Sequence, residues 1–267
     1  LMMFLPEQGK TSQRAITTEE TRLLLLASAN PRSKAIVHLF CATGCRPEGM
    51  ADLKMKDIDF MEDGFTGIIF YSGDKHEFQH FCHFEATAAI NDYLDTRKQK
   101  GEELTPETYL FSKVNCIGDE QGRMLGVGIG SVIEHLMKTS GIERVKQNKK
   151  RYDVPVCNGF RNRFNTILAR NKNIPYAIKE KFMDHNYRLE NSYFFPTKLE
   201  LLDEYKKAVP ELLVSKESRL KLENENKQKQ IENLESDKDI QINKMQLQID
   251  SMLEMFSTAK ELMKTKH

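Results

Sequence analysis

Residues 42–60 read ATGCRPEGMADLKMKDIDF, and the turn signals in this stretch set the limits of two helices. Upstream, Asn30 and Pro31 are a typical helix cap and first-turn proline, and Gly44 is a typical helix end. Pro47 fits the first turn of a second, short helix. We therefore expect one helix to end at Gly44 and another to begin at Pro47.

Strand-like runs follow at 56–60, 65–72 and 77–83. Gly64 and a turn at 73–75 separate them, which is the pattern of hairpin connections. The runs predict a three-stranded antiparallel meander.

The remaining periodic segments are helical. Thr17 and Glu20 have the spacing of a capping box, which marks a helix start. Helices are expected over 17–29, 31–44, 85–100, 128–139, 158–171, 174–183 and from 197 onward. The sequence therefore predicts a mainly α fold with a small antiparallel β-sheet, in the α+β class.

The composition excludes several classes of protein. Of the 267 residues, 39% are hydrophobic and 30% charged, so the chain can bury a core but is too polar for a membrane-embedded protein. No stretch reaches the ~20 apolar residues of a membrane span, and the first ten residues lack a signal-peptide pattern. The five cysteines are odd in number and include no CxxC pair, which argues against disulfides or structural zinc and favours a reducing cytosol.

The positive charge is concentrated in one segment, although the net charge is only +1. Residues 138–188 contain thirteen Lys and Arg against four Asp and Glu. Such a concentration attracts phosphate, because screening limits the reach of each charge to about 10 Å. Nucleic acid is therefore a candidate partner, and a solvated basic face is the alternative.

Residues 215–267 are rich in Glu, Lys, Gln and Asn and contain no Pro or Gly, which predicts a long exposed helix. The apolar residues in 242–263 follow a 3-4 spacing, whereas those upstream belong to an offset frame that begins at Leu213. Polar residues occupy several core positions of that upstream frame. A coiled coil with a stutter and a lone helix both fit this pattern.

Four short stretches hold chemically reactive residues: 42–60, YSGDKHEFQHF at 71–81, NGFRNRF at 158–164 and FMDHNYRLENSYFF at 182–195. In chain order they supply Arg, Lys, Arg, His and Tyr. Two guanidiniums can hold a phosphodiester and offset the charge of its transition state. A tyrosine hydroxyl can attack if a neighbour takes its proton, and Lys or His can protonate the leaving oxygen.

Together these stretches resemble the catalytic domain of the tyrosine recombinase (integrase) family. Thr43-Gly44-x-Arg46 matches the family's first arginine box, and Arg161 in the NGFR segment matches the second. The continuation at 193–214 is most like archaeal integrases. The resemblance spans roughly residues 17–214.

The other expected site residues also rest on this resemblance. Lys75 lies in the hairpin turn where the family keeps its catalytic lysine. The segment Met183-Asp184-His185 resembles the family's Leu-Gly-His segment. Tyr193 lies eight residues beyond His185, at about the nucleophile spacing.

The resemblance implies DNA strand cleavage and rejoining through a 3′-phosphotyrosyl intermediate. Tyr193 is expected to attack the scissile phosphate while Arg46 and Arg161 hold it. Lys75 is expected to protonate the leaving 5′ oxygen, and His185 to assist by a hydrogen bond or proton transfer.

Three residues depart from the family's pattern. Asn158 replaces the usual His of the second box, and it can contact phosphate but cannot exchange a proton. Gly49 stands where an acidic residue often follows the first arginine. Asp184 replaces a usual glycine and is expected either to raise the pKa of His185 or to cap a helix. The start of the sequence is expected to be a cut point in a longer protein, and binding with one domain is the alternative.

No cofactor and no metal are expected. The glycine run at 126–130 lacks the setting of a phosphate loop and is interpreted as a helix-entry loop. His76, His80, Cys82 and His83 are close in sequence, but alternation along a strand sends His83 to the opposite face from His80 and Cys82.

The expected organisation is a lead-in at 1–16, a tyrosine recombinase catalytic domain at 17–214 and a long C-terminal helix at 215–267. The expected partners are double-stranded DNA and further copies of the chain, as a dimer or tetramer on DNA through the C-terminal region. No membrane is expected, and the cytoplasm, at the nucleoid, is the expected location.

Three rival functions stay open. A type IB topoisomerase has the same chemistry, and a catalytically impaired DNA-binding or assembly protein fits Asn158. A scaffold that dimerises through 231–263 fits the C-terminal helix.

Overall fold

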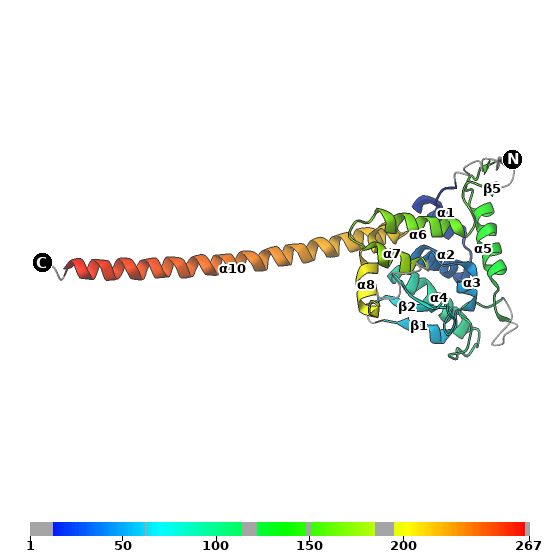
Figure 1. Ribbon diagram of the computed structural model, residues 1–267, viewed down its shortest axis with the longest axis horizontal. Coiled ribbons are helices and arrows are strands. Elements are labelled where there is room, and N and C mark those ends of the chain that lie inside the picture. Colours follow the sequence, from blue (N-terminus) through cyan, green and yellow to red (C-terminus); the bar gives the residue numbers. More distant parts are fainter. Residues whose placement is uncertain (1–12, 62, 114–121, 148–150, 185–194, 265–267) are drawn as a thin grey trace, which may run out of the picture. The chain divides into compact units, whose positions relative to one another are not determined.

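The computed structural model describes residues 13–61, 63–113, 122–147, 151–184 and 195–264 (Figure 1). The chain divides into two compact units, Leu1–Ser218 and Arg219–His267. The first unit is mostly helical and contains a small antiparallel sheet, which confirms the predicted α+β class.

The helices of the first unit agree closely with those predicted. They are α1 (Thr18–Ala27), α2 (Pro31–Thr43), α3 (Pro47–Asp52), a 3₁₀ turn η1 (Met55–Asp57), α4 (Phe84–Gln99), α5 (Gly126–Thr139), α6 (Asn158–Arg170), α7 (Tyr176–Phe182), α8 (Lys198–Lys206) and α9 (Val209–Leu212). The predicted capping box at the start of α1 is present, since the Thr17 hydroxyl accepts from Glu20 N and the Glu20 carboxylate from Thr17 N.

The predicted meander is confirmed. Its strands are β1 (Ile58–Phe60), β2 (Thr66–Phe70) and β3 (Phe78–Cys82), paired antiparallel in the order β1-β2-β3. In the register, Ile58 lies opposite Ile68 and Ile68 opposite His80. The β2–β3 turn therefore contains Lys75, as predicted.

A second, two-stranded sheet was not predicted. It pairs β4 (Lys146–Gln147) with β5 (Arg151–Tyr152). Each strand has only two residues and lies in the basic segment, so its sequence has too few alternating apolar positions to indicate a strand.

Helix α2 lies at the centre of the first unit and contacts α1, α4, α5, α6 and β3 (Figure 1). Its residues Ile36, Val37, Leu39 and Phe40 are fully buried. The Phe40 ring stacks on Phe160 of α6, with 5.4 Å between the ring centroids. This packing holds the start of α6 beside the end of α2.

Gly44 is required at the end of α2 for two reasons. Its φ is +58°, in the left-handed region that favours glycine, and its N–H donates to Phe40 O over 2.9 Å. A Cβ at this position would lie only 2.7 Å from Phe164 Cβ of α6. The glycine therefore both ends α2 and lets α6 approach the two residues before Arg46.

The glycine run at 126–130 belongs to α5, so the interpretation as a helix-entry loop is wrong. Helix α5 begins at Gly126, where a Cβ would lie 3.2 Å from Glu48 N of α3. The absence of a side chain allows α5 to start close against α3, which explains why glycine is tolerated in the first turn.

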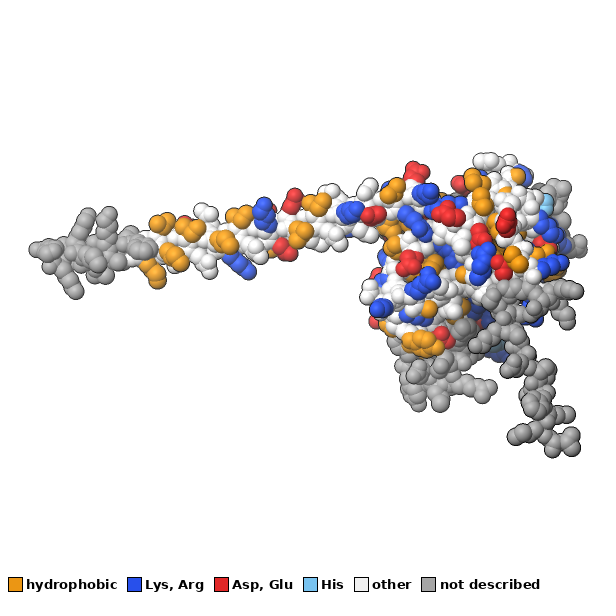
Figure 2. All heavy atoms as spheres, turned by 90° about the horizontal axis from the view of Figure 1, so that it is seen from above, with side chains coloured by type: hydrophobic (Ala, Val, Ile, Leu, Met, Phe, Trp, Pro, Cys, Tyr) orange, Lys and Arg blue, Asp and Glu red, His pale blue; other side chains and the backbone are white. Residues whose placement is uncertain are grey.

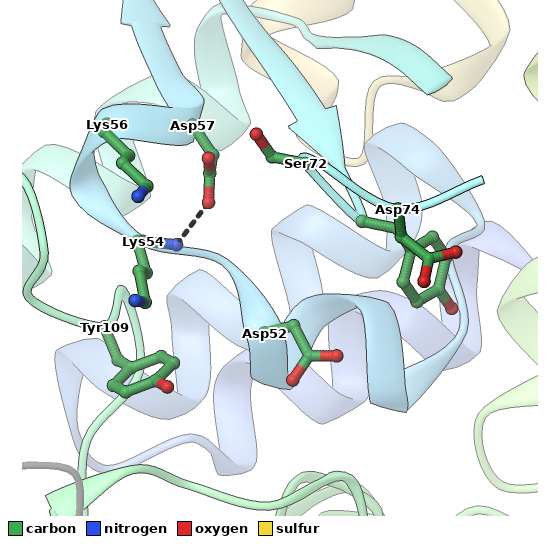
Figure 3. Close-up of a pocket in the computed structure, with 8 residues that line it drawn as sticks. Asp52, Lys54, Lys56, Asp57, Ser72, Asp74 and Tyr109 are labelled. Atoms are coloured by element: carbon green, nitrogen blue, oxygen red, sulfur yellow. Dashed lines mark hydrogen bonds between the residues drawn. The ribbon is translucent and has the colours of Figure 1, made fainter. Parts of the chain in front are cut away.

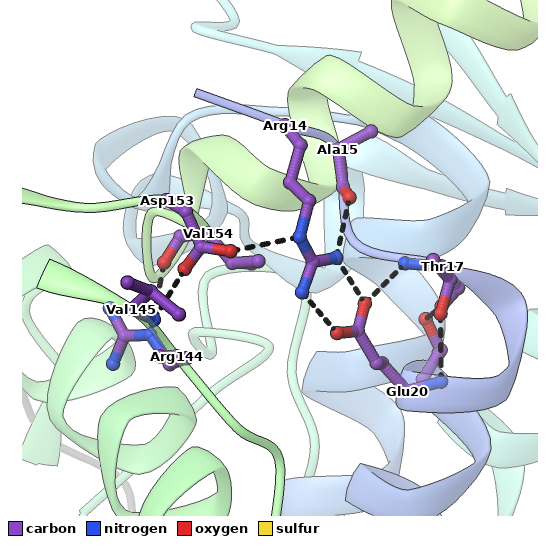
Figure 4. A network of polar contacts seen from close by, with 9 residues as sticks. Arg14, Ala15, Thr17, Glu20, Arg144, Val145, Asp153 and Val154 are labelled. Atoms are coloured by element: carbon purple, nitrogen blue, oxygen red, sulfur yellow. Dashed lines mark hydrogen bonds and ion pairs between the residues drawn. The ribbon is translucent and has the colours of Figure 1, made fainter. Parts of the chain in front are cut away.

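The segment before α1 is attached to the rest of the first unit (Figure 4). The Arg14 guanidinium is hydrogen-bonded to the carboxylates of Glu20 and Asp153, and Arg14 N donates to Asp153 O. Ile16 is buried in the core, and its N–H donates to Gly159 O at the start of α6. These bonds hold residues 14–16 against β5 and α6.

The end of the first unit is fixed by one buried carboxylate. Glu85 of α4 accepts from Val214 N over 2.8 Å and from Ser215 N over 3.0 Å. Leu213 was predicted to start the upstream frame of the C-terminal helix, but this is wrong. It follows α9 and is fully buried in the core, because α9 packs on α6.

Helix α10 (Lys216–Lys264) is the long C-terminal helix that was predicted. Leu222 is partly buried, and the large apolar side chains from Ile231 to Met255 are at least 47% exposed. Figure 2 shows them at intervals along the helix. No helix in the described part of the chain is long and apolar enough to cross a membrane.

Candidate active site

Arg46 stands immediately before α3, in the position that caps the helix. Its backbone is extended, because Pro47 disfavours the helical conformation in the residue before it. The Arg46 side chain is 46% exposed, and its Nη1 donates to Asp184 Oδ2 over 2.8 Å. The first predicted arginine therefore points toward the end of α7 and stays open to solvent.

Arg161 approaches the same place from α6. Its Nη1 donates to Gly44 O over 3.1 Å, and its Nη2 donates to Met183 O. Burial lowers the pKa of Arg161, and the nearby positive charge of Arg46 lowers it further. The two guanidiniums are thus close enough to repel each other, and an anion between them would relieve that repulsion.

Arg163, two residues further along α6, lies on the opposite side of the helix. It is 4% exposed, and its Nη2 donates to Glu211 O over 2.9 Å and to Leu212 O over 3.2 Å. This arginine attaches α9 to α6. Its contacts exclude it as the phosphate-binding alternative to Arg161.

Lys75 is exposed in the turn between β2 and β3. It lines a groove of about 280 Å³ together with Asp184, the partner of Arg46. Glu77, Glu180 and Lys181 line the same groove, so its charges are mixed. The structure thus brings Lys75, Arg46 and Arg161 to one side of the first unit, around the end of α7.

Asn158 is the first residue of α6 and is exposed. Arg161 follows three residues later, and side chains at this spacing share a helix face. Asn158 is thus placed on the side of α6 that carries Arg161, at the helix end where unpaired backbone N–H groups attract anions.

His185 and Tyr193 lie outside the described residues. The described chain stops at Asp184 and resumes at Phe195, and both of these residues line the groove that contains Lys75. The predicted roles of His185 and Tyr193 stay predictions.

Tyr71 is a neighbour of Arg46 that sequence reasoning missed. Its hydroxyl and Cζ lie 3.0 Å from where a Cβ at Gly49 would be. Burial raises the pKa of Tyr71, while the charge of Arg46 and a hydrogen bond with it oppose that rise. The aromatic ring therefore fills the space above Gly49, and the missing side chain at position 49 was the available signal.

The other side of Tyr71 borders a polar hollow of about 300 Å³ (Figure 3). Lys54, Asp57 and Tyr109 are among its lining residues, and Asp57 Oδ2 accepts from Lys54 N over 2.9 Å. Lys54 also pairs with Glu107 over 2.8 Å, so its charge is already compensated.

Asp184 has a contact that neither predicted role includes. Its φ is +50°, which explains why a glycine suits this position, and aspartate is among the residues that tolerate it. The carboxylate is 13% exposed and pairs with Arg46. Asp184 is therefore a partner of the first arginine, and its predicted effect on His185 concerns a residue outside the described ones.

Solved structures with a similar fold are recombinases and integrases. A crystal structure of XerA recombinase has a TM-score of 0.50 at 22% identity, over 72% of this chain and 64% of that one. The integrase from mycobacterium phage Brujita has a TM-score of 0.55 at 15% identity, over 78% and 62%. The Tn1549 transposon integrase in complex with transposon right end DNA has 0.51 at 16%, over 77% and 68%. The chain spans less than two thirds of the length of the first two.

The fold of the first unit is that of a tyrosine recombinase catalytic domain. Residues 14–189 match the sequence profile of the phage integrase family, which is more than half of the chain. The chain therefore belongs to the phage integrase family of tyrosine recombinases. No curated protein matches it.

Proposed function

We propose that the protein is a site-specific recombinase that cleaves and rejoins DNA strands through a phosphotyrosyl intermediate. Family membership supports the class of reaction. The observation that carries the proposal is that Arg46, before α3, and Arg161 of α6 both donate to residues at the end of α7, where Asp184 lines a groove together with Lys75.

In the proposed reaction, the Tyr193 hydroxyl oxygen forms a bond to the scissile phosphorus, and the bond from phosphorus to the 5′ oxygen breaks. The phenolic proton passes to His185, and Lys75 gives a proton to the departing 5′ oxygen. Arg46 and Arg161 hold the non-bridging oxygens and offset the growing charge. A 5′-hydroxyl from another strand reverses the step, so no ATP is consumed.

The chain length beyond the groove is compatible with this role. Tyr193 is two residues from Phe195, which lines the groove, and two peptide units span at most about 7.6 Å between Cα atoms. His185 directly follows Asp184 in the same way. The short chain distance from these two groove-lining residues supports the roles proposed for His185 and Tyr193.

DNA is the proposed partner, and the basic segment supports this. Lys138, Lys146 and Arg151 are exposed, which leaves them able to contact phosphates. Buried Arg163 does not contribute to this surface.

A covalent-adduct assay tests the proposal. The full chain is incubated with a pool of nicked suicide duplexes, and a denaturing gel is examined for a protease-sensitive shifted band. We expect the band with the wild type and its loss in Tyr193→Phe. Arg170→Ala, which changes an exposed arginine of α6 away from Arg161, is the matched control and should retain the band.

The second candidate is a catalytically impaired DNA-binding protein, and the exposed Asn158 on the Arg161 side of α6 favours it. The same experiment separates the two. DNA binding with no covalent band from the wild type would support the impaired protein and contradict the recombinase.

We further propose that α10 joins copies of the chain. Ile242, Met245, Ile249 and Met252 follow the 3-4 spacing of a coiled-coil seam and are 49–61% exposed. Light scattering should give a dimer or tetramer for the full chain and a monomer after truncation at Ser218. An unchanged mass after truncation would contradict this role.

A further inference from the structure

Two residues with unusual backbone conformations lie next to Arg46. Among the residues that the structure describes, the non-glycine residues with positive φ are Tyr71, at +54°, and Asp184, at +50°. This region is unfavourable for a bulky side chain, and it persists only where the surroundings enforce it. The two residues belong to different parts of the chain, since Tyr71 follows β2 and Asp184 follows α7. Both lie beside Arg46.

Asp184 and Tyr71 interact with Arg46 in different ways. Asp184 Oδ2 accepts from Nη1 over 2.8 Å, and the Tyr71 hydroxyl lies close enough to Arg46 for the positive charge of the guanidinium to lower the pKa of the phenol. The Tyr71 ring has its place because Gly49 has no side chain. The Arg46 side chain remains 46% exposed, so the two partners leave room for a further anion.

Arg161 is fixed in another way. Its two Nη atoms donate to the main-chain carbonyls of Gly44 and Met183. Carbonyls of a helix end and of a buried residue have fixed positions, so Arg161 needs no side-chain partner for its orientation. Arg46 precedes its helix, and the neighbours that act on its guanidinium are the side chains of Asp184 and Tyr71.

We propose that Tyr71 and Asp184 are positioning residues that orient the Arg46 guanidinium for the scissile phosphate. This inference rests on the proposed recombinase function. The left-handed conformations at Tyr71 and Asp184 accompany the approach of both side chains to one arginine. Asp184 also precedes residue 185, so it links the position of Arg46 to the chain that leads to the proposed nucleophile.

The first test measures single-turnover adduct formation at saturating DNA in Asp184→Asn and Tyr71→Phe. Asn tolerates the left-handed conformation and Phe keeps the ring, so each variant removes mainly the contact with Arg46. We expect the rate to fall about 10-fold in each, because misorientation of a group that holds the reacting centre costs rate. The dissociation constant for DNA should change less than about 2-fold, since other cations supply most of the attraction.

The matched controls remove similar contacts elsewhere. Asp63→Asn breaks the Lys206 ion pair of 2.9 Å, whose members are 42% and 40% exposed. Tyr109→Phe removes a hydroxyl beside the polar hollow. Both controls should react at the wild-type rate. Rates in Asp184→Asn and Tyr71→Phe that match these controls would overturn the proposal.

Asp184→Gly separates positioning from stability. Glycine adopts φ near +50° without strain, so the melting temperature should equal or exceed that of the wild type while the rate still falls about 10-fold. A rate that follows the melting temperature across all variants would show a merely structural role. Loss of the adduct in Tyr71→Phe but not in Tyr193→Phe would make Tyr71 the nucleophile and overturn the inference.

A measurement without DNA distinguishes this inference from the proposed function. Rotation of the Arg46 guanidinium about its Nε–Cζ bond, followed by NMR and assigned with Arg46→Lys, should be slow in the wild type and faster in both variants. Slow rotation with no adduct from the wild type would leave the positioning intact and contradict only the recombinase. Fast rotation in the wild type would refute the positioning.

Discussion

The two sides of α6 carry arginines that both donate to main-chain carbonyls but differ in exposure and in the charges around them. Arg161 faces the Arg46 region, keeps part of its surface open and has a pKa lowered by burial and by Arg46. Arg163 is buried and donates to the carbonyls that end α9. The number of Lys and Arg residues in a segment therefore does not distinguish side chains that are open to a ligand from buried side chains that join helices.

The largest effect is expected from Arg161→Ala. The adduct rate should fall by about 10³-fold, or about 4 kcal/mol, because one of two groups that offset the transition-state charge is lost. The free energy of unfolding should change by less than about 1.5 kcal/mol, since the carbonyls of Gly44 and Met183 lose one neighbour each. Single-turnover gels and urea titration measure the two. A rate within 10-fold of wild type would break the distinction between the two sides of α6.

Arg163→Met should reverse that pattern. The substitution keeps an apolar side chain but leaves Glu211 O and Leu212 O without their charged donor, which should cost about 3 kcal/mol of unfolding free energy. Urea titration at pH 7 gives the value. Under conditions where the variant is folded, its adduct rate should stay within about 3-fold of wild type, and a larger loss would place Arg163 in the reaction.

Two fully buried histidines, His80 and His83, make the stability of the fold sensitive to acid. Burial lowers the pKa of His80 and of His83 to about 3, with Arg161 adding to the effect at His80 and Arg163 at His83. Because the unfolded histidine has a pKa near 6.5, its stabilising effect is full above that pH and is lost as the pH falls toward 3. Each should remove about 2 kcal/mol of stability by pH 5. His83→Leu should lose correspondingly less between pH 7 and pH 5 in urea titrations, and an equal loss would contradict the assignment.

Asn158→His should give the smallest change in the adduct rate, and it tests whether the side of α6 that carries Arg161 faces the phosphate. An imidazole at this exposed position can exchange a proton, so we expect the adduct rate to rise about 10-fold, or about 1.4 kcal/mol, with a new dependence on pH between 6 and 7. Rates at pH 5.5 and 7.5 measure the effect. An unchanged rate would show that residue 158 does not face the phosphate.

Local signals predicted most of the fold. The cap at Asn30, the glycine at 44 and the capping box at Thr17 each act within a few residues, and each begins or ends the helix that was expected. The meander followed from alternation and turn residues in the same way. The β4–β5 hairpin was missed because two-residue strands have almost no period to detect.

Contacts between distant residues were not predictable. Arg46 and Arg161 were found from their motifs, but the sequence gives no reason for Asp184 to pair with Arg46 across 138 positions. Tyr71 was not predicted for the same reason, because its ring lies beside Arg46 only where the missing side chain of Gly49 leaves room for it. Leu213 was assigned to the wrong element because an apolar residue beside a helix start fits either a core or a helix seam.

The buried thiol between Gly44 and Arg46 gives this region a chemical reporter. Cys45 is 4% exposed, and burial raises its pKa to about 12, so it exists as an unreactive thiol at neutral pH. Alkylating reagents therefore reach Cys45 only when the segment that connects α2 and α3 opens. The rate at which Cys45 becomes labelled by such a reagent therefore measures how often the segment that carries Arg46 opens, and the measurement needs no DNA.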